Sequence, residues 1–405
     1  MNYKGYPTII VHGFFGWGDS DFINKVAPYF GGYWGAGDKG IDKYLMSQGY
    51  EAYCPSVGPW NSSWDRSCEL YAIIKGGTVD YGKVHSEKHH HARYGRTYPG
   101  LIKDWGEPGQ HAKINIIGHS FGGPTVCRFT SLMEAGSEEE RAGTPAEELS
   151  PLFAGGHGNL VHTATTLSGT NNGTTMASFA RNKIGDLVNW LLLGVLSTTF
   201  GDTPVMKFWD MKMDRFGISK DPKDITSWHL RKPTACREGV EAYIANDEDN
   251  IMREMSVETQ AEINKQLTIS PHMYYFAHQA CRSKKIGNTN IQLMELKSFP
   301  IAHISALITG WFNSPSLKKN FGVNADWFAS DGPVNTICCR GPFVGKAQPA
   351  VDWKDGMEIK PGVWHNMPVE HKDHFSWMGY LEKKQTYYDD FRAMVERANS
   401  LPDAD

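Results

Sequence analysis

The sequence predicts an α/β fold: a mainly parallel central sheet flanked by helices, with insertions above it. Five short apolar or β-branched runs are candidate buried strands, at 8–12, 113–118, 160–167, 272–278 and 301–310. Residues 124–134, directly after the second run, have the spacing of a helix. Strands that alternate with helices form βαβ units, whose strands are parallel. We expect one domain over residues 1–405.

Composition excludes several classes of protein. With 405 residues, 40% of them hydrophobic, the chain can bury a large core, so a disordered or fibrous protein is excluded. Forty-one Lys and Arg against 45 Asp and Glu give a net charge of -4 without a basic block, so we expect no nucleic-acid partner. The longest strongly apolar run, 187–196, is shorter than the roughly 18 residues that a membrane span needs, so we expect no transmembrane anchor.

Seven cysteines are scattered along the chain, and none forms a CxxC pair. This pattern indicates neither a disulfide framework nor a cysteine zinc site. The first residues lack the apolar stretch of a signal peptide. We expect that a signal peptide either was removed from this chain or never existed. Three segments break the rhythm of strands and helices and are expected to be insertions: 62–99 is rich in histidine, 176–202 is apolar, and 210–250 is charged.

A sharp turn with a serine at its centre follows the second strand. Residues 118–122 read Gly-His-Ser-Phe-Gly and match G-x-S-x-G, between a strand and a helix. In this position the motif holds a nucleophile in a strained turn that needs small neighbours. Ser120 is therefore the predicted nucleophile. The turn and the sheet together predict an α/β-hydrolase fold.

A serine needs a base and an acid, which on this fold follow it in the order acid, then histidine. Asp331 is the best acid, because it lies in a turn-forming run late in the chain, and His374 is the best base. Spacing alone leaves rivals open, which are Asp326, Asp352 and Asp355 for the acid and His365 and His371 for the base.

A tetrahedral intermediate needs hydrogen-bond donors aimed at its oxygen. One donor should be the backbone N–H of Phe121, directly after the serine. The other should come from Phe14 in the loop after the first strand.

Several longer blocks resemble one family, the zinc-containing thermoalkalophilic bacterial lipases and their staphylococcal relatives. The blocks are VHGFFGWG (11–18), SVGPWNSSWDRSCELY (56–71), KGGTVDYGKVHSEKHHHARYGRTYPGL (75–101), IIGHSFGG (116–123), LSPLFAGGHGN (149–159), NNGTTM (171–176), SDGPVNT (330–336) and KPGVWHNM (360–367). The resemblance implies a triad of Ser120, Asp331 and His374. It implies an oxyanion hole at Phe14 and Phe121.

The same resemblance implies a structural zinc ion, held by two aspartates and two histidines. The matching positions are Asp65, His85, His91 and Asp249, although a shift of the alignment in the acidic run 246–250 would bring Asp247 or Glu248 to the last place. Imidazole and carboxylate ligands suit Zn²⁺. The zinc-binding segment is expected at about 60–100, and a lid or cap at about 176–250.

Calcium is not expected. Members of the family bind it with an acidic residue two positions after the catalytic histidine and another five further on. The sequence has Ser376 and Leu381 at these places. A hard cation needs several oxygen ligands, so we expect no calcium site of that type.

The expected function is a serine carboxylic ester hydrolase, a lipase or esterase that cleaves acylglycerols or other water-insoluble esters, including aliphatic polyesters. The resemblance implies an extracellular enzyme. Two alternatives stay open. A zinc-dependent hydrolase would lose turnover with a chelator but not with an organophosphate. A non-catalytic binding protein on the same fold would have no turnover.

Overall fold

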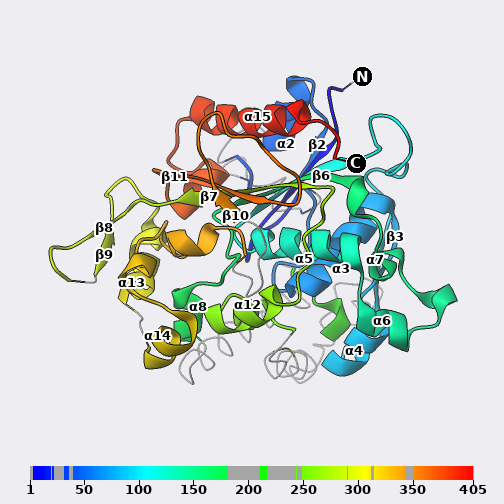
Figure 1. The fold of residues 1–405 in the computed structure, drawn as a ribbon, viewed down its shortest axis with the longest axis horizontal. Helices are drawn as coiled ribbons and strands as arrows, with labels where there is room; N and C mark the ends of the chain where they lie inside the picture. Colours follow the sequence, from blue (N-terminus) through cyan, green and yellow to red (C-terminus); the bar gives the residue numbers. More distant parts are fainter. Residues whose placement is uncertain are drawn as a thin grey trace, which may run out of the picture.

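The computed structural model describes residues 3–19, 21, 32–35, 40–180, 210–216, 243, 249–289, 291–311, 314–342 and 350–404. Its centre is a sheet of seven strands in the order β10, β11, β7, β6, β5, β1, β2, and every adjacent pair is parallel (Figure 1). The strands are β1 (Thr8–Val11), β2 (Ala52–Tyr53), β5 (Ile114–His119), β6 (Val161–Leu167), β7 (Tyr274–Ala280), β10 (Ala350–Asp352) and β11 (Trp364–Glu370). The predicted α/β fold class is confirmed.

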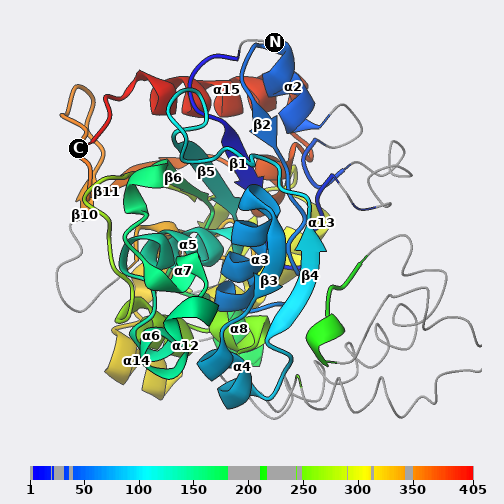
Figure 2. The same cartoon turned by 90° about the vertical axis from the view of Figure 1, so that its right-hand side faces the viewer.

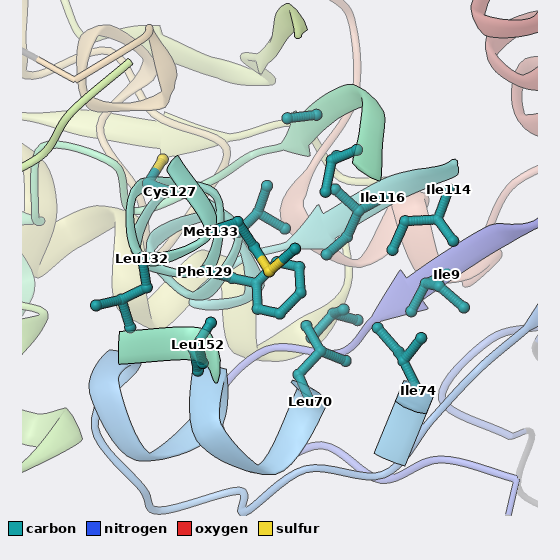
Figure 3. Close-up of a cluster of buried hydrophobic side chains, with 14 of the residues drawn as sticks. Ile9, Leu70, Ile74, Ile114, Ile116, Cys127, Phe129, Leu132, Met133 and Leu152 are labelled. Atoms are coloured by element: carbon teal, nitrogen blue, oxygen red, sulfur yellow. The ribbon is translucent and has the colours of Figure 1, made fainter. Parts of the chain in front are cut away.

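Helices cover both faces of the sheet because successive strand residues point to opposite sides. Ile9 of β1 packs toward α3 (Ser63–Lys75) and α5 (Gly122–Ala135), in the core that Figure 3 shows. Ile10, the next residue, packs toward α2 (Ile41–Ser47) and α15 (Lys384–Ser400) on the other face. Figures 1 and 2 show α2 and α15 together on that second face.

Smaller elements surround this sandwich. Two antiparallel strand pairs join β3 (Gly77–Asp80) to β4 (Tyr94–Tyr98) and β8 (Ser283–Lys285) to β9 (Gln292–Met294). The other helices are α4 (Lys83–His89), α6 (Glu138–Gly143), α7 (Pro151–Ala154), α8 (Thr175–Ala180), α11 (Ile251–Glu254), α12 (Val257–Asn264), α13 (Pro300–Trp311) and α14 (Pro315–Phe321). Short 3₁₀ helices are η2 (Ala146–Glu148), η3 (Gly158–Leu160), η5 (Asp214–Phe216), η7 (Ala325–Trp327), η8 (Thr336–Cys339) and η9 (His374–Met378).

Four of the five predicted strands are confirmed as β1, β5, β6 and β7. The fifth prediction, a strand over 301–310, is wrong, because this segment forms α13. Its buried residues Ala302 and Ala306 are four apart and its exposed residues Ile301 and Ile304 are three apart, which is helical spacing. A short apolar run rich in isoleucine does not distinguish the two structures.

The expected insertions differ in how they relate to the core. In the first, α3 packs into the main core through Leu70 and Ile74, and β3 adds Val79 to it, whereas α4 lies beyond it (Figure 2). Most of the expected lid or cap lies outside the described residues, namely 181–209, 217–242 and 244–248. Among the described helices, none is long and apolar enough to cross a membrane.

Candidate active site and metal centre

The predicted nucleophile lies in a strained turn between β5 and α5. Ser120 has a φ of 57°, which a non-glycine residue keeps only where its surroundings hold it. The backbone holds it here: Ser120 N–H donates to Leu167 O at 3.0 Å, and Ser120 O accepts from Gly123 N at 2.9 Å. A Cβ on Gly118 would lie 2.2 Å from Gly122 O, so only glycine fits at that position. These contacts are the local reason for the G-x-S-x-G pattern.

Asp331 and His374, the predicted acid and base, are in direct contact. His374 Nδ1 lies 2.8 Å from Asp331 Oδ2, and His374 N–H donates to Asp331 O at 3.0 Å. Asp331 is fully buried, and its other oxygen accepts from Val334 N–H at 2.9 Å. His374 begins η9, whose N-cap is Asp373. Two backbone-anchored turns therefore hold the imidazole and the carboxylate together.

His374 lies beside the residue that precedes the serine, at the end of β5. The ring of His119, which precedes Ser120, lies 4.6 Å from the ring of His374. Within the described chain no hydrogen bond joins Ser120 Oγ to His374 Nε2. Such bonds commonly shorten only when substrate is bound.

The rival residues have other partners. Asp352 pairs with Arg340, Asp355 accepts from the Trp353 indole, His365 contacts Tyr275 O, and His371 pairs with Glu295. Asp326 is an exposed residue of η7.

The two predicted oxyanion donors lie on either side of Ser120. Gly13 packs against the serine so closely that a Cβ there would lie 3.0 Å from Ser120 Oγ, which places the 12–15 loop beside it. In the described part of the chain, neither the Phe14 nor the Phe121 backbone N–H donates to a protein acceptor. Both amides are therefore available to an oxygen of a substrate.

A buried arginine that the sequence analysis missed fixes this loop. Arg66 of α3 donates to the carbonyls of His12 and Gly58 and, through Nε, to Thr125 Oγ1 at 2.8 Å. Its guanidinium is fully buried, so each of these bonds replaces water that it gave up. The motif SSWDR contains Arg66, but nothing local in that pattern indicates that it reaches the first strand.

Apolar side chains line the surroundings of the site. Phe121 clusters with Ala177 of α8 and with Ile251 and Met255, and Phe14 packs against this cluster. Phe14 also meets Trp60, at 4.9 Å between ring centroids. An apolar wall beside the serine favours an acyl chain over a polar group.

The four predicted metal ligands come together far from the serine in sequence. Asp65, His85, His91 and Asp249 each offer a ligand atom, and these atoms lie within 4.8 Å of one another. His85 Nε2 is 3.5 Å from oxygens of both aspartates, and His91 Nε2 is 3.3 Å from Asp249 Oδ2. Asp247 and Glu248, the alternatives to Asp249, lie outside the described residues.

The donor set fits a divalent cation. Asp65 is fully buried, and neither of its oxygens, nor Nε2 of His85 or His91, makes a hydrogen bond within the described chain. Burial lowers the pKa of His85, but the Asp249 and Asp65 carboxylates outweigh it and raise that pKa to about 9. Two carboxylates and two imidazoles are a tetrahedral set that Zn²⁺ accepts. Arg215 forms an ion pair with Asp65 Oδ2, without the geometry of a hydrogen bond.

The parallel sheet and the strained turn between β5 and α5 define the class of protein, which is an α/β-hydrolase fold with a serine at this turn. The family model described as "Lipase-like, C-terminal domain" matches residues 4–396. The chain belongs to this lipase family, and the resemblance found in the sequence is confirmed.

Known proteins of several bacteria are similar to this chain. Lipase 1 of Staphylococcus aureus is 30% identical over 376 residues, 92% of this chain and 50% of the relative. The chain thus spans about half the length of the curated relatives it matches. Among solved structures, EstA from Clostridium botulinum is 31% identical, with a TM-score of 0.79 over 99% of this chain and 90% of that one. Lipase 1 from Pelosinus fermentans is 32% identical, with a TM-score of 0.76 over 98% and 100%.

Proposed function

We propose that this protein is a serine carboxylic ester hydrolase of the lipase or esterase type. The observation that carries the proposal is the 2.8 Å contact between His374 and Asp331 at the end of the sheet where Ser120 occupies its strained turn. A buried carboxylate next to Nδ1 orients the ring so that Nε2 can act on the serine. Family membership supports the same chemistry.

In the proposed reaction Ser120 Oγ attacks the ester carbonyl carbon while His374 Nε2 takes its proton. The backbone N–H groups of Phe14 and Phe121 stabilise the oxyanion. His374 then protonates the leaving alcohol, which leaves an acyl-enzyme on Ser120. Water, activated by the same imidazole, releases the acid, and Asp331 stabilises the imidazolium in both steps.

Water-insoluble esters are the proposed substrates, including acylglycerols and aliphatic polyesters. The apolar wall of Phe14 and Phe121 supports an acyl chain at the serine. The exposed face of α13 supports contact with an apolar surface, because Ile301 and Ile304 are 58% and 67% exposed. We also propose an extracellular location, since a film or an oil droplet is attacked from outside the cell.

Asp65, His85, His91 and Asp249 would hold a zinc ion that joins the 60–100 segment to residue 249. With all four positions supplied by protein, such an ion stabilises the fold and activates no water. We propose one domain over 1–405, with this zinc-binding segment and a lid or cap at about 176–250 as insertions.

The test is hydrolysis of p-nitrophenyl esters of graded chain length by the wild-type protein and by Ser120→Ala, with and without chelator. We expect Ser120→Ala to lower kcat at least about a thousandfold. The chelator should leave kcat unchanged as long as the protein stays folded. Turnover by Ser120→Ala would exclude the proposal. If the chelator abolishes turnover while Ser120→Ala does not, the result favours the zinc-dependent hydrolase. If the wild-type protein shows no turnover on any ester, the result favours the binding protein. Acid released from a polyester film, measured against Ser120→Ala, tests the polyester substrate.

A further inference from the structure

A second group of metal-ligand atoms lies on the opposite side of the sheet from α3 and α5. Asp19, Asp42 and Cys54 each offer one ligand atom, and these atoms lie within 4.8 Å of one another. They come from the loop after β1, from α2 and from the residue after β2. A backbone hydrogen bond of 3.0 Å from Asp19 N–H to Cys54 O holds two of these segments together. The group uses none of the residues of the Asp65 cluster.

Two polar atoms at this group are buried and unsatisfied. Asp42 is 6% exposed, and its Oδ1 accepts no hydrogen bond within the described chain. Tyr387 of α15 is 3% exposed, its hydroxyl also has no hydrogen-bond partner there, and it interacts electrostatically with Cys54 and Asp42. Buried polar atoms are nearly always paired in proteins, with other protein groups, with ordered water or with an ion, and two unpaired ones beside three metal-ligand atoms favour the ion here.

Charge points to a cation as that group. The carboxyl groups of Asp19, which is partly buried, and Asp42, which is buried, lie close enough to interact, and two negative charges at that separation repel one another. Lys43, the neighbouring residue of α2, is exposed, so solvent screens its attraction for the two carboxylates. Cys54 is 2% exposed, so a thiolate there also needs a positive partner.

We propose that Asp19, Asp42 and Cys54 bind a second divalent ion, and that the ion is zinc. A thiolate selects zinc over magnesium or calcium, and two carboxylates and a thiolate leave a fourth position of the tetrahedron for water. The thiol proton leaves to solvent as the zinc–sulfur bond forms. The ion fastens the loop that begins with the oxyanion residues to α2 and β2. Figure 2 shows α2 and β2 at one end of the molecule and α4, which carries His85, at the other.

The sulfur ligand separates the two metal sites in one experiment. The full-length protein is freed of metal with a chelator and titrated with Co²⁺, and the near-ultraviolet sulfur-to-cobalt charge-transfer band is recorded. The Asp65 cluster has no sulfur, so the band reports the second site alone. We expect two zinc ions per chain by elemental analysis and a band that has saturated by two equivalents of Co²⁺, with the intensity of one thiolate-bound cobalt per chain. One zinc ion per chain together with no band would overturn the proposal.

Four variants locate the ligands. Cys54→Ser and Asp19→Asn should each lose the band and one zinc ion, and Asp19→Asn, at a less buried residue, keeps the test open if Cys54→Ser does not fold. His85→Ala should lose one zinc ion and keep the band. Cys68→Ser is the matched control, because Cys68 is equally buried and lies near Asp65. A band that persists in Asp19→Asn and Cys54→Ser but vanishes in Cys68→Ser would assign the sulfur to the first site and overturn the proposal.

Discussion

His119 hydrogen bonds through Nε2 to the backbone carbonyl of His374, at 3.0 Å. Burial and then the neighbouring His374 lower the pKa of His119 well below its ordinary value, so at neutral pH the ring carries a single N–H. That N–H can donate at Nε2 only if Nδ1 accepts, and Tyr33 Oη lies 2.7 Å from Nδ1. Tyr33 Oη in turn accepts from Gly13 N–H at 2.7 Å. The 12–15 loop, which carries one of the proposed oxyanion donors, is thus connected to the proposed base.

Tyr33→Phe should impair turnover without weakening substrate binding. The variant removes the hydroxyl that fixes the His119 tautomer, so the bond to His374 O is weakened and the base is less well positioned. We expect kcat to fall roughly tenfold, as for one lost hydrogen bond, with KM changed less than about twofold. Tyr44→Phe is the control, because Tyr44 stacks on Tyr388 outside this chain of bonds. An unchanged kcat in Tyr33→Phe would refute a positioning role.

Removing the metal at the Asp65 cluster should lower the melting temperature and leave kcat nearly unchanged. In His85→Ala the remaining ligands keep two buried carboxylates without a full set of partners, so we expect the melting temperature to fall by more than about 5 °C. At a temperature where the variant is folded, kcat should stay within about twofold of wild type. His90→Asn is the control, because His90 lies outside the cluster at a φ of 57° that asparagine tolerates. Loss of kcat in the folded variant would favour a catalytic zinc.

The sequence could predict those features that are local. Three isoleucines between 114 and 117 indicate a buried strand, and Gly118, Ser120 and the glycines at 122 and 123 follow within a few positions, so the strand and the sharp turn are both visible in the local sequence. The same holds for β1 and its loop. His85 and His91 are six residues apart, and the resemblance to a family supplied Asp65 and Asp249 as their partners.

Other parts of the site depend on contacts that no local pattern carries. Tyr33, Arg66 and His119 are ordinary residue types whose roles arise only when three distant segments meet. Spacing could not separate Asp331 from Asp326, because both lie in polar turns. In the structure Asp331 is buried against His374, whereas Asp326 is exposed. The 301–310 segment was misassigned because its pattern depends on which face the fold buries.

Glu254 should make stability fall as pH rises toward neutrality. Burial raises the pKa of this carboxyl from 4.5 to about 7. Between these values the folded state binds one more proton than the unfolded state, so the free energy of unfolding falls with rising pH. Glu254→Gln keeps an oxygen for Ser63 N–H, which now donates to Glu254 Oε2 at 2.8 Å. We expect the variant to gain stability relative to wild type from pH 5 to pH 8, by at most about 3 kcal/mol.

Chemical denaturation at each pH measures this difference. Glu262→Gln is the control, because the Glu262 side chain is 64% exposed and should give a difference that does not change with pH. A constant difference for Glu254→Gln as well would contradict the prediction.

Calcium should not change the melting temperature of the protein. Arg282 brings its guanidinium to the acidic residues near the proposed base, at 2.6 Å from Glu382 Oε1 and 3.4 Å from Asp373 Oδ2. Ser376 donates to Asp373, and Leu381 points into solvent with 62% exposure. A fixed cation next to two carboxylates disfavours Ca²⁺ there. Melting curves with excess Ca²⁺ and with a calcium chelator should coincide, and a stabilisation of several degrees by Ca²⁺ would show that a site exists.

The apolar face of α13 should matter for insoluble substrates and not for soluble ones. This helix is adjacent to the turn that carries Asp331, because a Cβ on Gly332 would lie 2.8 Å from the Ala302 side chain. Phe299, the residue before the helix, donates its N–H to Asp373, next to His374, at 2.9 Å. Ile304 is 67% exposed on this helix, so burying it against a lipid surface gains roughly 1.5 to 3 kcal/mol.

We therefore expect Ile304→Gln to lower activity on a dilute emulsion of triacylglycerol about tenfold to a hundredfold, because less enzyme is bound at the surface of the droplets. Hydrolysis of dissolved p-nitrophenyl acetate should not change, since that ester reaches Ser120 from solution. Val369→Gln provides the matched control, because Val369 is 54% exposed on β11, outside α13. Equal losses on both substrates would place Ile304 in the fold or the site, and equal losses in both variants would indicate a general effect of surface polarity on adsorption.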